Sequence, residues 1–303
     1  MDRFKALSIF VAVAEEGGFA AAGRRVGLSA PSVTRLVSEL ETDLGAALFH
    51  RTTRSVQLTQ VGEGFFVRTV QLLGDLDEAV QAVAGQQDEP SGNVSITGSV
   101  LFGRIVLTPL IFELMDLYPL LRLSTLFADR IVHMVDEGLD VAVRLAHLPD
   151  SSLMAIRVGA VRRVVCASPA YLDAYGEPAS IGDLEAHQIV QFAQNLNPEA
   201  WSFQKAGQVV SFRTVPRLMV NNADAAIAAA VEGRGITRVL SYQIADHVAA
   251  GRLVHLLEAY EGEPIPVHVV HKEGAHVSRR VRVVVDHLVS ALRVSSLLAR
   301  ETN

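Results

Sequence analysis

The stretch that most restricts the fold of this chain is "LSAPSVTRLVSELETDLG" at residues 28–45, because it carries the signals for both ends of a helix. Ser29 can accept a hydrogen bond from the free N–H groups of a first turn, and Pro31 suits that turn because no N–H is needed there. Gly45 is the residue type that commonly ends a helix. The sequence therefore predicts one helix from Ser29 to about Leu44.

The two faces of this predicted helix differ in chemistry. One face is apolar and contains Val33, Leu36, Val37, Leu40 and Leu44. The other face is small and polar and contains Pro31, Thr34, Arg35, Ser38 and Thr42. A solvated face in an acidic protein more often carries Glu and Lys, so a nearly acid-free face favours close approach to another molecule. An ordinary amphipathic surface helix remains the alternative.

Two helical segments precede this helix and a strand-like segment follows it. Phe4, Leu7, Val11 and Ala14 recur at helical spacing until "EEGG" ends the pattern, and a short helix is expected over about 19–26. The segment "LFHRTTRSVQLT" at 48–59 is rich in β-branched residues and arginine, as a hairpin or wing requires. In a helix-turn-helix, the second helix enters the major groove, where an arginine can pair bidentately with guanine. This order of elements predicts DNA binding.

The overall charge argues against a nucleic-acid binder, whereas the local charge allows one. The net charge is −6 and the pI is about 5.9. Between residues 24 and 54, however, five arginines stand against three acidic residues: Arg24, Arg25, Arg35, Arg51 and Arg54 against Glu39, Glu41 and Asp43. A small basic face is therefore compatible with the acidic chain.

A long helix is predicted from Thr59 to about Ala84. Apolar and small residues along it alternate at spacings of four and three, at Phe65, Thr69, Leu72, Leu76, Ala79 and Val83. This is the pattern of a coiled-coil seam, and it favours pairing between two chains. Packing of the helix on its own N-terminal domain is the alternative.

Beyond a linker, "GQQDEPSGN" at 85–93, strand-like and helix-like segments alternate to the end of the chain. Strands are expected at "NVSIT", "LRLSTLF", "LDVAVRL", "RRVVCAS", "VVSFRTVPRLMV", "GITRVL" and "VHVVH", and helices at 100–117, 130–137, 223–232 and from 278. Such alternation is typical of a mostly parallel sheet covered by helices on both faces. The fold class is therefore α/β overall.

Several classes of protein are disfavoured by the residues themselves. No apolar run of about 18 residues without a charge is present, and no convincing secretory cleavage pattern follows the N-terminus, so a cytoplasmic protein without membrane contact is expected. The single cysteine, Cys166, is expected to be an inert buried thiol. His268, His271 and His276 suggest a metal site, but positions three apart on a strand face opposite sides. No metal and no cofactor are expected.

The N-terminal residues carry a resemblance to a known family. Residues 3–84 resemble the winged helix-turn-helix and linker helix of LysR-type transcriptional regulators, above all in the "LExxLGxxLFxR" phrase at 40–51. Ala30 and Leu36 stand where family members often have glutamine, which leaves the preferred DNA sequence open. The resemblance implies DNA contacts, to bases or nearby phosphates, from Ser29, Pro31, Ser32, Thr34 and Arg35, with Arg51 and Arg54 of the wing on backbone phosphates.

The resemblance continues through the rest of the chain, where the family carries an effector domain similar to periplasmic solute-binding proteins. The matching phrases are "GNVSITGS", "LYPLLRL", "GLDVAVRL", "VVCASPAYLDAYGEP" and "AAIAAAVEGRGITRV". A cleft between two lobes would bind a small molecule. The residues expected to line it are Ser99, Val100, Leu101, Ala128, Arg130, Arg144, Leu145, Phe192, Trp201 and Asn222. Two alternatives stay open: Ser99 caps its helix, and Arg144 pairs with Asp140 or Glu137.

These observations predict a transcriptional regulator, activator and/or repressor, that responds to a small-molecule effector. The expected parts are a DNA-binding domain at 1–58, a linker helix and hinge at 59–90 and an effector domain at 91–303, with lobe I at about 91–161 and 266–303 and lobe II at about 162–265. The expected partners are double-stranded DNA, the effector, a second copy that pairs through Phe65, Leu72, Leu76 and Val83, a tetramer of such dimers, and RNA polymerase. A solute-binding module and an enzyme are the rivals, and neither has a distinctive motif here.

Overall fold

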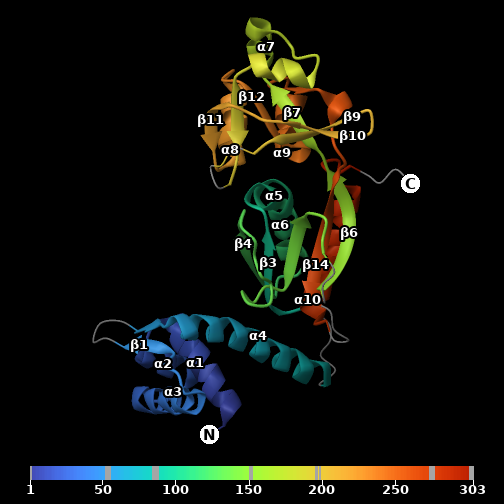
Figure 1. Cartoon of the computed structure of the whole chain (residues 1–303). Helices are drawn as coiled ribbons and strands as arrows, with labels where there is room; N and C mark the ends of the chain where they lie inside the picture. The colour runs from blue at the N-terminus through green and yellow to red at the C-terminus, as the bar shows by residue number, and fades with distance from the viewer. Residues whose placement is uncertain are drawn as a thin grey trace.

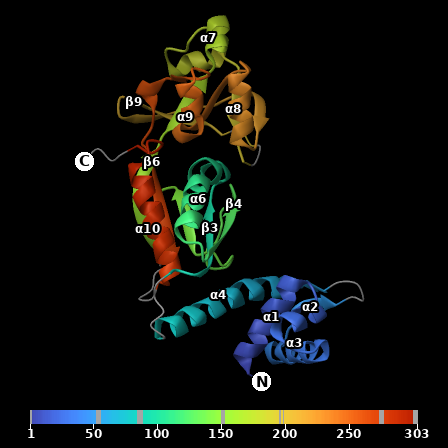
Figure 2. The same cartoon turned by 180° about the vertical axis from the view of Figure 1, so that it is seen from behind.

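A computed structural model describes residues 2–51, 56–83, 89–149, 153–194, 197, 199–272 and 277–299, without the side chains of 77–79 and 81–83. The chain forms an N-terminal helical domain, a long linker helix and two α/β lobes that follow one another along the molecule (Figure 1). Seen from behind, the linker helix again passes below the first lobe, and the second lobe lies at the far end (Figure 2). The N-terminal domain and the second lobe therefore stand at opposite ends of the molecule.

The N-terminal domain contains the predicted helices and hairpin. Its elements are α1 (Arg3–Glu16), α2 (Phe19–Val26), α3 (Ala30–Leu44), β1 (Phe49–Arg51) and β2 (Val56–Leu58), followed by the linker helix α4 (Gln60–Val83). Phe10 is fully buried at the centre, and its ring centroid lies 5.3 Å from the ring centroids of both Phe49 and Phe65. One aromatic cluster therefore joins α1, the hairpin and the start of the linker helix.

Capping residues fix the ends of these helices. Ser29 precedes α3, and its side-chain oxygen accepts a hydrogen bond from the N–H of Ser32. Gly45 ends α3 with a φ of 66°, a left-handed conformation that glycine adopts without steric penalty. At the start of α4, the Thr59 hydroxyl accepts the Gly62 N–H at 2.9 Å and donates to the Ala47 carbonyl at 2.8 Å. The predicted start and end of α3 and the predicted start of α4 are confirmed, while the end expected near residue 84 lies outside the described residues.

The first lobe is built on one five-stranded sheet in the order β4-β3-β5-β14-β6. Its strands are β3 (Gly92–Gly98), β4 (Leu121–Phe127), β5 (Val141–Leu145), β6 (Leu153–Val161) and β14 (Ile265–Lys272). Its helices are α5 (Val100–Phe102), a π-helical segment at Gly103–Leu107, α6 (Thr108–Leu117) and α10 (Arg279–Val294). Strand β14 returns from the second lobe and inserts between β5 and β6, so this sheet combines segments from both ends of the effector domain.

The second lobe has its own five-stranded sheet in the order β11-β8-β12-β7-β13. The strands are β7 (Arg163–Ala167), β8 (Ile189–Phe192), β11 (Pro216–Val220), β12 (Ile236–Leu240) and β13 (Val254–Leu256), with a hairpin of β9 (Trp201–Lys205) and β10 (Gln208–Phe212). The helices are α7 (Pro169–Tyr175), α8 (Ala223–Val231), α9 (Ser241–Ala249) and 3₁₀ turns at Ile181–Ala186 and Glu258–Tyr260. Arg162 joins β6 to β7, so the chain passes directly from one sheet to the other.

The prediction of a mostly parallel sheet is wrong, because both sheets are mixed. In the first lobe, β3 is parallel to β4 and β5, whereas β14 is antiparallel to β5 and β6. In the second lobe, β8 is parallel to β11 and β12, whereas β7 is antiparallel to β12 and β13. The antiparallel pairs involve the strands that carry the chain from one lobe to the other and back. A simple series of strand-helix crossovers contains no such strands and would give parallel pairs only.

Two predicted segments also differ from the structure. Residues 130–137 form an irregular segment that passes into a turn at 134–138 instead of a helix, since Val132 and Met134 are both buried and two residues at this spacing do not share one side of a helix. The single strand expected over 209–220 is two strands, β10 and β11, which belong to different sheets. Pro216 is the first residue of β11. The buried Thr214 lies between the two strands, and its hydroxyl donates to the Gln191 side chain at 2.7 Å.

The two lobes share apolar packing on one side. The Phe102 ring of the first lobe meets the Tyr242 ring of the second lobe edge-on, with centroids 5.1 Å apart, and both side chains are buried. Ala223 and Ile227 of α8 belong to the same buried cluster as the core of the first lobe. Arg104 and Asp224 add an exposed ion pair between the lobes, with 2.8 Å between Nη2 and Oδ1. The lobes are therefore held together by more than the two chain crossings.

Candidate nucleic-acid interface and inter-lobe pocket

Helix α3 is held against α2 by a tight turn. The Leu28 N–H donates to the Gly23 carbonyl at 2.9 Å, and a Cβ atom at position 23 would lie 2.7 Å from the Leu28 oxygen. Only glycine therefore allows this approach without a backbone shift. On α3 itself, Val33, Val37 and Leu40 are buried in the domain core, whereas Leu44 is exposed. The predicted apolar face thus ends at Leu40, and the first three turns of α3 are fixed to the core.

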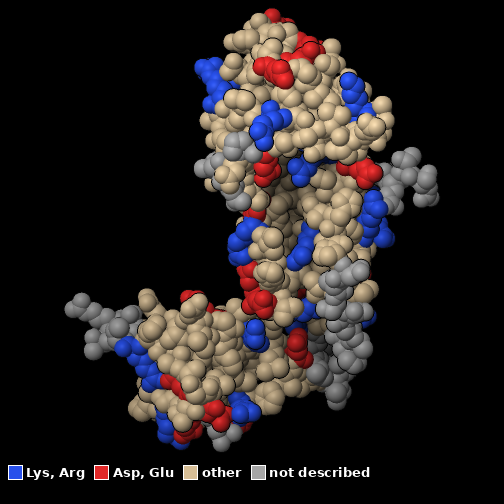
Figure 3. All heavy atoms as spheres, in the orientation of Figure 1, with Lys and Arg blue, Asp and Glu red and all other residues tan. Residues whose placement is uncertain are grey.

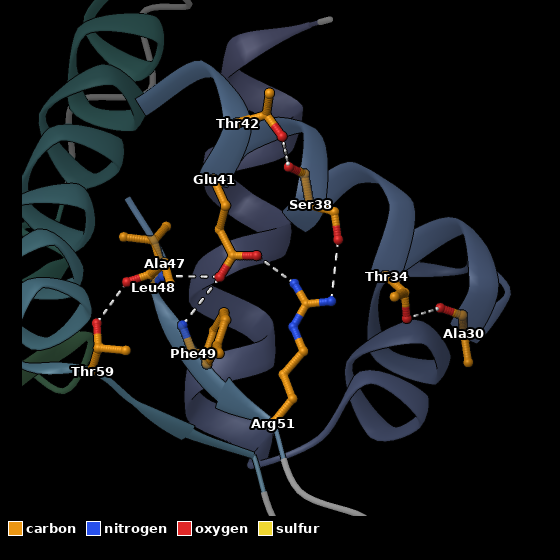
Figure 4. Close-up of polar contacts among 10 residues, drawn as sticks. All are labelled: Ala30, Thr34, Ser38, Glu41, Thr42, Ala47, Leu48, Phe49, Arg51 and Thr59. Atoms are coloured by element: carbon orange, nitrogen blue, oxygen red, sulfur yellow. Dashed lines mark hydrogen bonds and ion pairs between the residues drawn. The ribbon is translucent and has the colours of Figure 1, made fainter. Parts of the chain in front are cut away.

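The opposite face of α3 is open, and most of its hydroxyls are engaged locally. Pro31 and Arg35 are exposed, as is the capping Ser29. The Ser29 and Ser32 hydroxyl oxygens lie 2.8 Å apart. The Thr34 hydroxyl donates to the Ala30 carbonyl at 2.9 Å (Figure 4). These bonds fix the side-chain positions while leaving the oxygens able to accept further bonds. The N-terminal half of α3 therefore presents a rigid, small-featured polar surface.

Arg35 is the principal cation of this surface and is paired in the structure. Its Nη1 atom lies 2.9 Å from Oε1 of Glu39, one helical turn further along, and its side chain is 69% exposed. A groove of about 820 Å³ lies beside the pair and is lined by Arg3, Arg35, Ser38, Glu39, Thr42 and Asp43. An exposed ion pair contributes at most about 1 kcal/mol, so a stronger anionic partner can displace Glu39.

Arg51 of the wing bonds to its own domain. Its Nη2 atom lies 2.5 Å from Oε2 of Glu41, and its Nη1 atom donates to the Ser38 hydroxyl at 3.1 Å (Figure 4). Its guanidinium also stacks 5.0 Å from the Phe19 ring centroid. The same Glu41 carboxylate accepts the N–H groups of Leu48 and Phe49. Arg51 therefore joins the wing to α3.

Glu41 is a site residue that the sequence reasoning missed. Its position inside the "LExxLGxxLFxR" phrase, ten residues before Arg51, was the available signal. The other wing arginine expected to contact phosphate, Arg54, lies outside the described residues.

Among the described arginines of the N-terminal domain, all except Arg24 pair with an acidic side chain. Arg3 pairs with Asp43 at 2.8 Å, and Arg25 pairs with Glu15 at 2.5 Å. Space-filling atoms show the two charge types side by side on this domain (Figure 3). Arg24 is exposed and forms no ion pair with the described residues. The positive charge of the basic face expected from the sequence is thus offset by ion pairs within the domain. A bound polyanion would replace these carboxylates as the partner of the arginines.

The seam of the linker helix divides into a buried part and an exposed part. Phe65 packs against the N-terminal core and Thr69 is buried, which fits the alternative of packing within the chain. Leu72 and Leu76 are 49% and 36% exposed, so apolar surface remains for a partner there. The side chain of Val83 lies outside the described residues.

A pocket of about 430 Å³ lies where the strands of the first lobe end. Its lining comes from the end of β3 and the residue after it (Thr97, Gly98, Ser99), from residues that follow β4 (Ala128 to Val132), from residues of and after β5 (Ala142 to Pro149) and from Gln194 of the second lobe. Gln194 donates through Nε2 to the Asp129 carbonyl. The pocket therefore lies at the carboxyl edge of β3, β4 and β5 and touches both lobes.

The structure brings together half of the expected effector residues. Ser99, Ala128, Arg130, Arg144 and Leu145 line the inter-lobe pocket, whereas Phe192 and Trp201 line a separate pocket in the second lobe. The remaining three line neither pocket. Leu101 is buried in the core, Val100 donates its N–H to Asp129, and Asn222 caps α8 by accepting the Asp224 N–H at 2.7 Å. The sequence could not show that these residues line two different pockets, since the pockets are adjacent and share Gln194.

The two alternatives left open by the sequence, an ion pair of Arg144 and helix capping by Ser99, can be compared with the contacts in the structure. Arg144 pairs with neither Asp140 nor Glu137 and instead donates from Nη2 to the Val132 carbonyl at 3.0 Å. Glu137 pairs with Arg130, whose guanidinium holds the pKa of that carboxyl at about 2. Ser99 makes no side-chain capping bond. Burial raises the pKa of Tyr242 to about 12, and hydrogen bonds with Ser99 and Gln243 oppose this rise.

The described cysteine and histidine side chains singled out in the sequence form no catalytic arrangement. Cys166 is fully buried, as predicted, and burial raises the pKa of its thiol to about 12. His268 is partly buried and His271 bonds to the Lys272 carbonyl, while His276 lies outside the described residues. In the part of the chain that the structure describes, no group of three or more His, Cys, Asp or Glu residues could hold a metal ion.

Two family models match this chain. Residues 4–63 match the bacterial regulatory helix-turn-helix protein, lysR family, and residues 87–293 match the LysR substrate binding domain. The chain belongs to the LysR family of transcriptional regulators. The resemblance inferred from the sequence is therefore confirmed, as is the fold of a helix-turn-helix domain followed by a two-lobed α/β domain.

Relatives of this LysR-family chain are transcriptional regulators rather than enzymes. An HTH-type transcriptional regulator of Xanthomonas campestris is 33% identical over 94% of this chain and 84% of its own length. An HTH-type transcriptional repressor of Pseudomonas aeruginosa is 30% identical over 94% of this chain and 91% of its own length. The solved structure of CrgA, a LysR-type regulator from Neisseria meningitidis, is 28% identical with a TM-score of 0.62, covering 95% of this chain and 98% of CrgA. Among the described helices, none is long and apolar enough to cross a membrane.

Proposed function

We propose that this regulator reads double-stranded DNA with the N-terminal half of α3, using Ser29, Pro31, Ser32, Thr34 and Arg35. One observation carries the proposal: the buried face of α3 is fixed to the domain core, while its opposite face presents Arg35 on a surface of small polar side chains. Arg35 leaves Glu39 and pairs with a guanine edge, which exchanges a weak pair for a bidentate one. Arg51 orients the wing through Glu41, and both Arg51 and Arg54 are assigned to backbone phosphate.

Fluorescence anisotropy tests this role on the DNA that flanks the coding region, against a scrambled duplex at two salt concentrations. Arg35→Ala should weaken specific binding by about 1 to 3 kcal/mol, roughly 5- to 150-fold. Glu39→Ala is the matched control, because it breaks the same ion pair but keeps Arg35. It should bind at least as well as the wild type. If both variants lose affinity equally, the pair acts only through helix stability, and Arg35 has no role in reading DNA.

A small-molecule effector occupies the inter-lobe pocket in this proposal, with Ser99, Ala128, Arg130, Arg144 and Leu145 around it. The volume of about 430 Å³ suits a metabolite-sized ligand, and Arg144 offers a guanidinium that a carboxylate can receive. The effector acts by linkage, since it must bind two arrangements of the regulator unequally to shift DNA binding.

Residues 128–140 form the connection between that pocket and the linker helix. One end, Ala128 to Val132, lines the pocket. At the other end, the Gln71 side chain of α4 donates to the Gly138 carbonyl and, at 3.2 Å, to Asp140. Between them, the Arg130–Glu137 pair and the buried Val132, Met134 and Leu139 hold the segment together. A displacement at the pocket therefore reaches the helix that carries the DNA-binding domain.

Candidate effectors are titrated while DNA affinity and footprint are followed. A true effector changes one of them in the wild type, and Gln71→Ala reduces that change while ligand affinity stays within about twofold. If the Gln71→Ala variant responds to the effector as strongly as the wild type, the 128–140 segment does not transmit the effector signal through Gln71.

The remaining assignments complete the proposed regulator. The domains are 1–58, 59–90 and 91–303, and the protein acts in the cytoplasm. Two copies pair along the exposed seam at Leu72 and Leu76, dimers associate into tetramers, and RNA polymerase is the partner when the protein activates transcription. Exposed apolar side chains on the linker helix support pairing.

A further inference from the structure

A second pocket lies wholly within the second lobe. It has a volume of about 270 Å³ and lies among β7, β8, β12 and the start of the β9 hairpin. Trp201 and Phe192 supply aromatic walls, and Arg163 and Arg238 supply positive charge. The pocket meets the inter-lobe pocket only at Gln194, and Ser99, Arg130 and Arg144 are not part of it.

The two arginines of this pocket lie on one face of the sheet. In the antiparallel register of β12 and β7, Arg238 is opposite Val165 and Leu240 is opposite Arg163, so the two arginines are diagonal neighbours. Like charges at such positions repel unless an anion lies between them or a carboxylate is close. This arrangement has no apparent value for the stability of the sheet.

Arg238 is incompletely satisfied by the protein. Its Nη2 atom donates to the Ser202 carbonyl at 2.6 Å and its guanidinium stacks 5.1 Å from the Phe203 ring centroid. Its Nε atom, however, is buried and has no hydrogen-bond partner among the described residues. Burial, followed by the charge of Arg163, lowers the pKa of Arg238 to about 10. A guanidinium donor without an acceptor is costly, and an anion on the accessible part of this half-buried guanidinium would compensate its charge.

The nearby carboxylates leave positive charge in excess. Arg163 is exposed and forms no hydrogen bond or ion pair with the described residues. Glu261, which partly offsets the charge on Arg238, is committed to Arg162 at 2.9 Å between Oε2 and Nη1. Glu199 lines the pocket as an exposed residue, and its backbone carbonyl is the atom that accepts from the buried Gln191. Two guanidinium groups therefore line the pocket, and at most one free carboxylate, that of Glu199, is present to balance their charge.

We propose that this second-lobe pocket binds a small anion, a carboxylate or a phosphate, between Arg163 and Arg238, separately from the effector of the inter-lobe pocket. Arg238 supplies a half-buried guanidinium that the Ser202 carbonyl and the Phe203 ring hold in place, and Arg163 supplies a second, exposed guanidinium. Trp201 and Phe192 accommodate a small carbon skeleton on an organic acid.

Trp201 makes the proposal directly testable, because it is the only tryptophan of the chain and it lines this pocket. The full-length protein is titrated with inorganic phosphate, with succinate and with neutral succinamide at constant ionic strength, while tryptophan fluorescence is recorded. Phosphate or succinate should produce a saturable change, and succinamide should produce none. Saturation by only one of the two anions identifies the preferred group.

Arg163→Gln should weaken anion binding about tenfold or more, the loss expected for one charge-assisted contact. Arg163 is exposed, so this variant is expected to fold. Arg217→Gln, an exposed arginine on β11 of the same lobe, and Arg144→Gln in the inter-lobe pocket should titrate like the wild type. The proposal is overturned if no anion gives saturation, if Arg163→Gln titrates like the wild type, or if Arg144→Gln removes the signal.

Discussion

Asp75 on the linker helix and Arg280 in the first turn of α10 lie 205 positions apart in the sequence, and Oδ1 of Asp75 is 2.5 Å from Nη2 of Arg280. Arg280 is 5% exposed at its side chain, whereas Asp75 is 63% exposed. The buried guanidinium also donates to the carbonyls of Gly74 and Asn93, at 3.2 and 3.1 Å. One arginine thus holds the linker helix, the start of β3 and the last helix together.

Arg280→Met should reduce the free energy of unfolding by about 1 to 3 kcal/mol, because the Gly74 and Asn93 carbonyls lose a buried donor. Asp75→Asn should cost less than about 1 kcal/mol, since its side chain is mostly exposed and its amide oxygen can still accept a hydrogen bond. Urea denaturation followed by circular dichroism measures both. Equal losses in the two variants would show that the ion pair, and not the carbonyl contacts, provides the stability.

Gly62→Ala should destabilise the N-terminal domain by about 1 to 3 kcal/mol, because a Cβ atom there would lie 2.1 Å from the Leu48 carbonyl oxygen. Gly64, two residues further along the same helix, is the control, since an alanine methyl group there would meet no atom within 4 Å. Gly64→Ala should be neutral or stabilising by up to about 1 kcal/mol, because alanine favours helix. Thermal unfolding compares the two, and a harmless Gly62→Ala would contradict the close packing of α4 on the hairpin.

Leu76→Glu should weaken dimerisation at least tenfold, because it places a carboxylate in the exposed part of the seam. Sedimentation equilibrium gives the dissociation constant. Val215→Glu adds the same charge at an exposed valine of the second lobe and should leave the dimer unchanged. An intact dimer in Leu76→Glu would move the interface away from the linker helix.

Glu137→Gln should lose stability in a pH-dependent way. The pKa of Glu137 is held at about 2 by Arg130, below its ordinary value of 4.5, so the pair stabilises the fold fully above about pH 4.5. Its contribution is lost as the pH falls from 4.5 towards 2. Urea denaturation from pH 6 to pH 3 should show the stability difference between wild type and Glu137→Gln narrowing, and Arg130→Gln should behave alike. A constant difference over this range would contradict the assigned pairing.

The N-terminal domain could be predicted from the sequence because its signals are local. Ser29, Pro31 and Gly45 mark the ends of α3 within a few residues, and the apolar spacing identifies its buried face. The mixed sheets could not be predicted in this way, since the insertion of β14 between β5 and β6 depends on a contact more than a hundred residues distant. The helix predicted at 130–137 was wrong because Arg130 and Glu137 suit a helix, while the burial of Val132 and Met134 decides otherwise.

For the candidate sites too, residues with local sequence signals could be predicted, and residues that depend on long-range contacts could not. Arg35 was identifiable from its place on a helix face, and Arg144 from its place at the end of a strand. The partner of Arg51 required the hairpin to fold back on α3, so Glu41 was passed over. Arg163 and Arg238 are 75 positions apart and become neighbours only through the register of β7 and β12. Pairings of this kind are set by the sheet and leave no periodic pattern in the sequence.

The first lobe is built from two segments of the chain that are separated by the second lobe, and this affects the order in which the protein can fold during synthesis. The N-terminal domain and the second lobe are continuous segments, so each can fold as it leaves the ribosome. The first lobe retains a vacant position between β5 and β6 until residues 265–272 emerge, and Arg280 follows only after that. The attachment of the linker helix to the sensor is therefore completed last, and a nascent chain that stalls before α10 carries a finished DNA-binding domain without control over it.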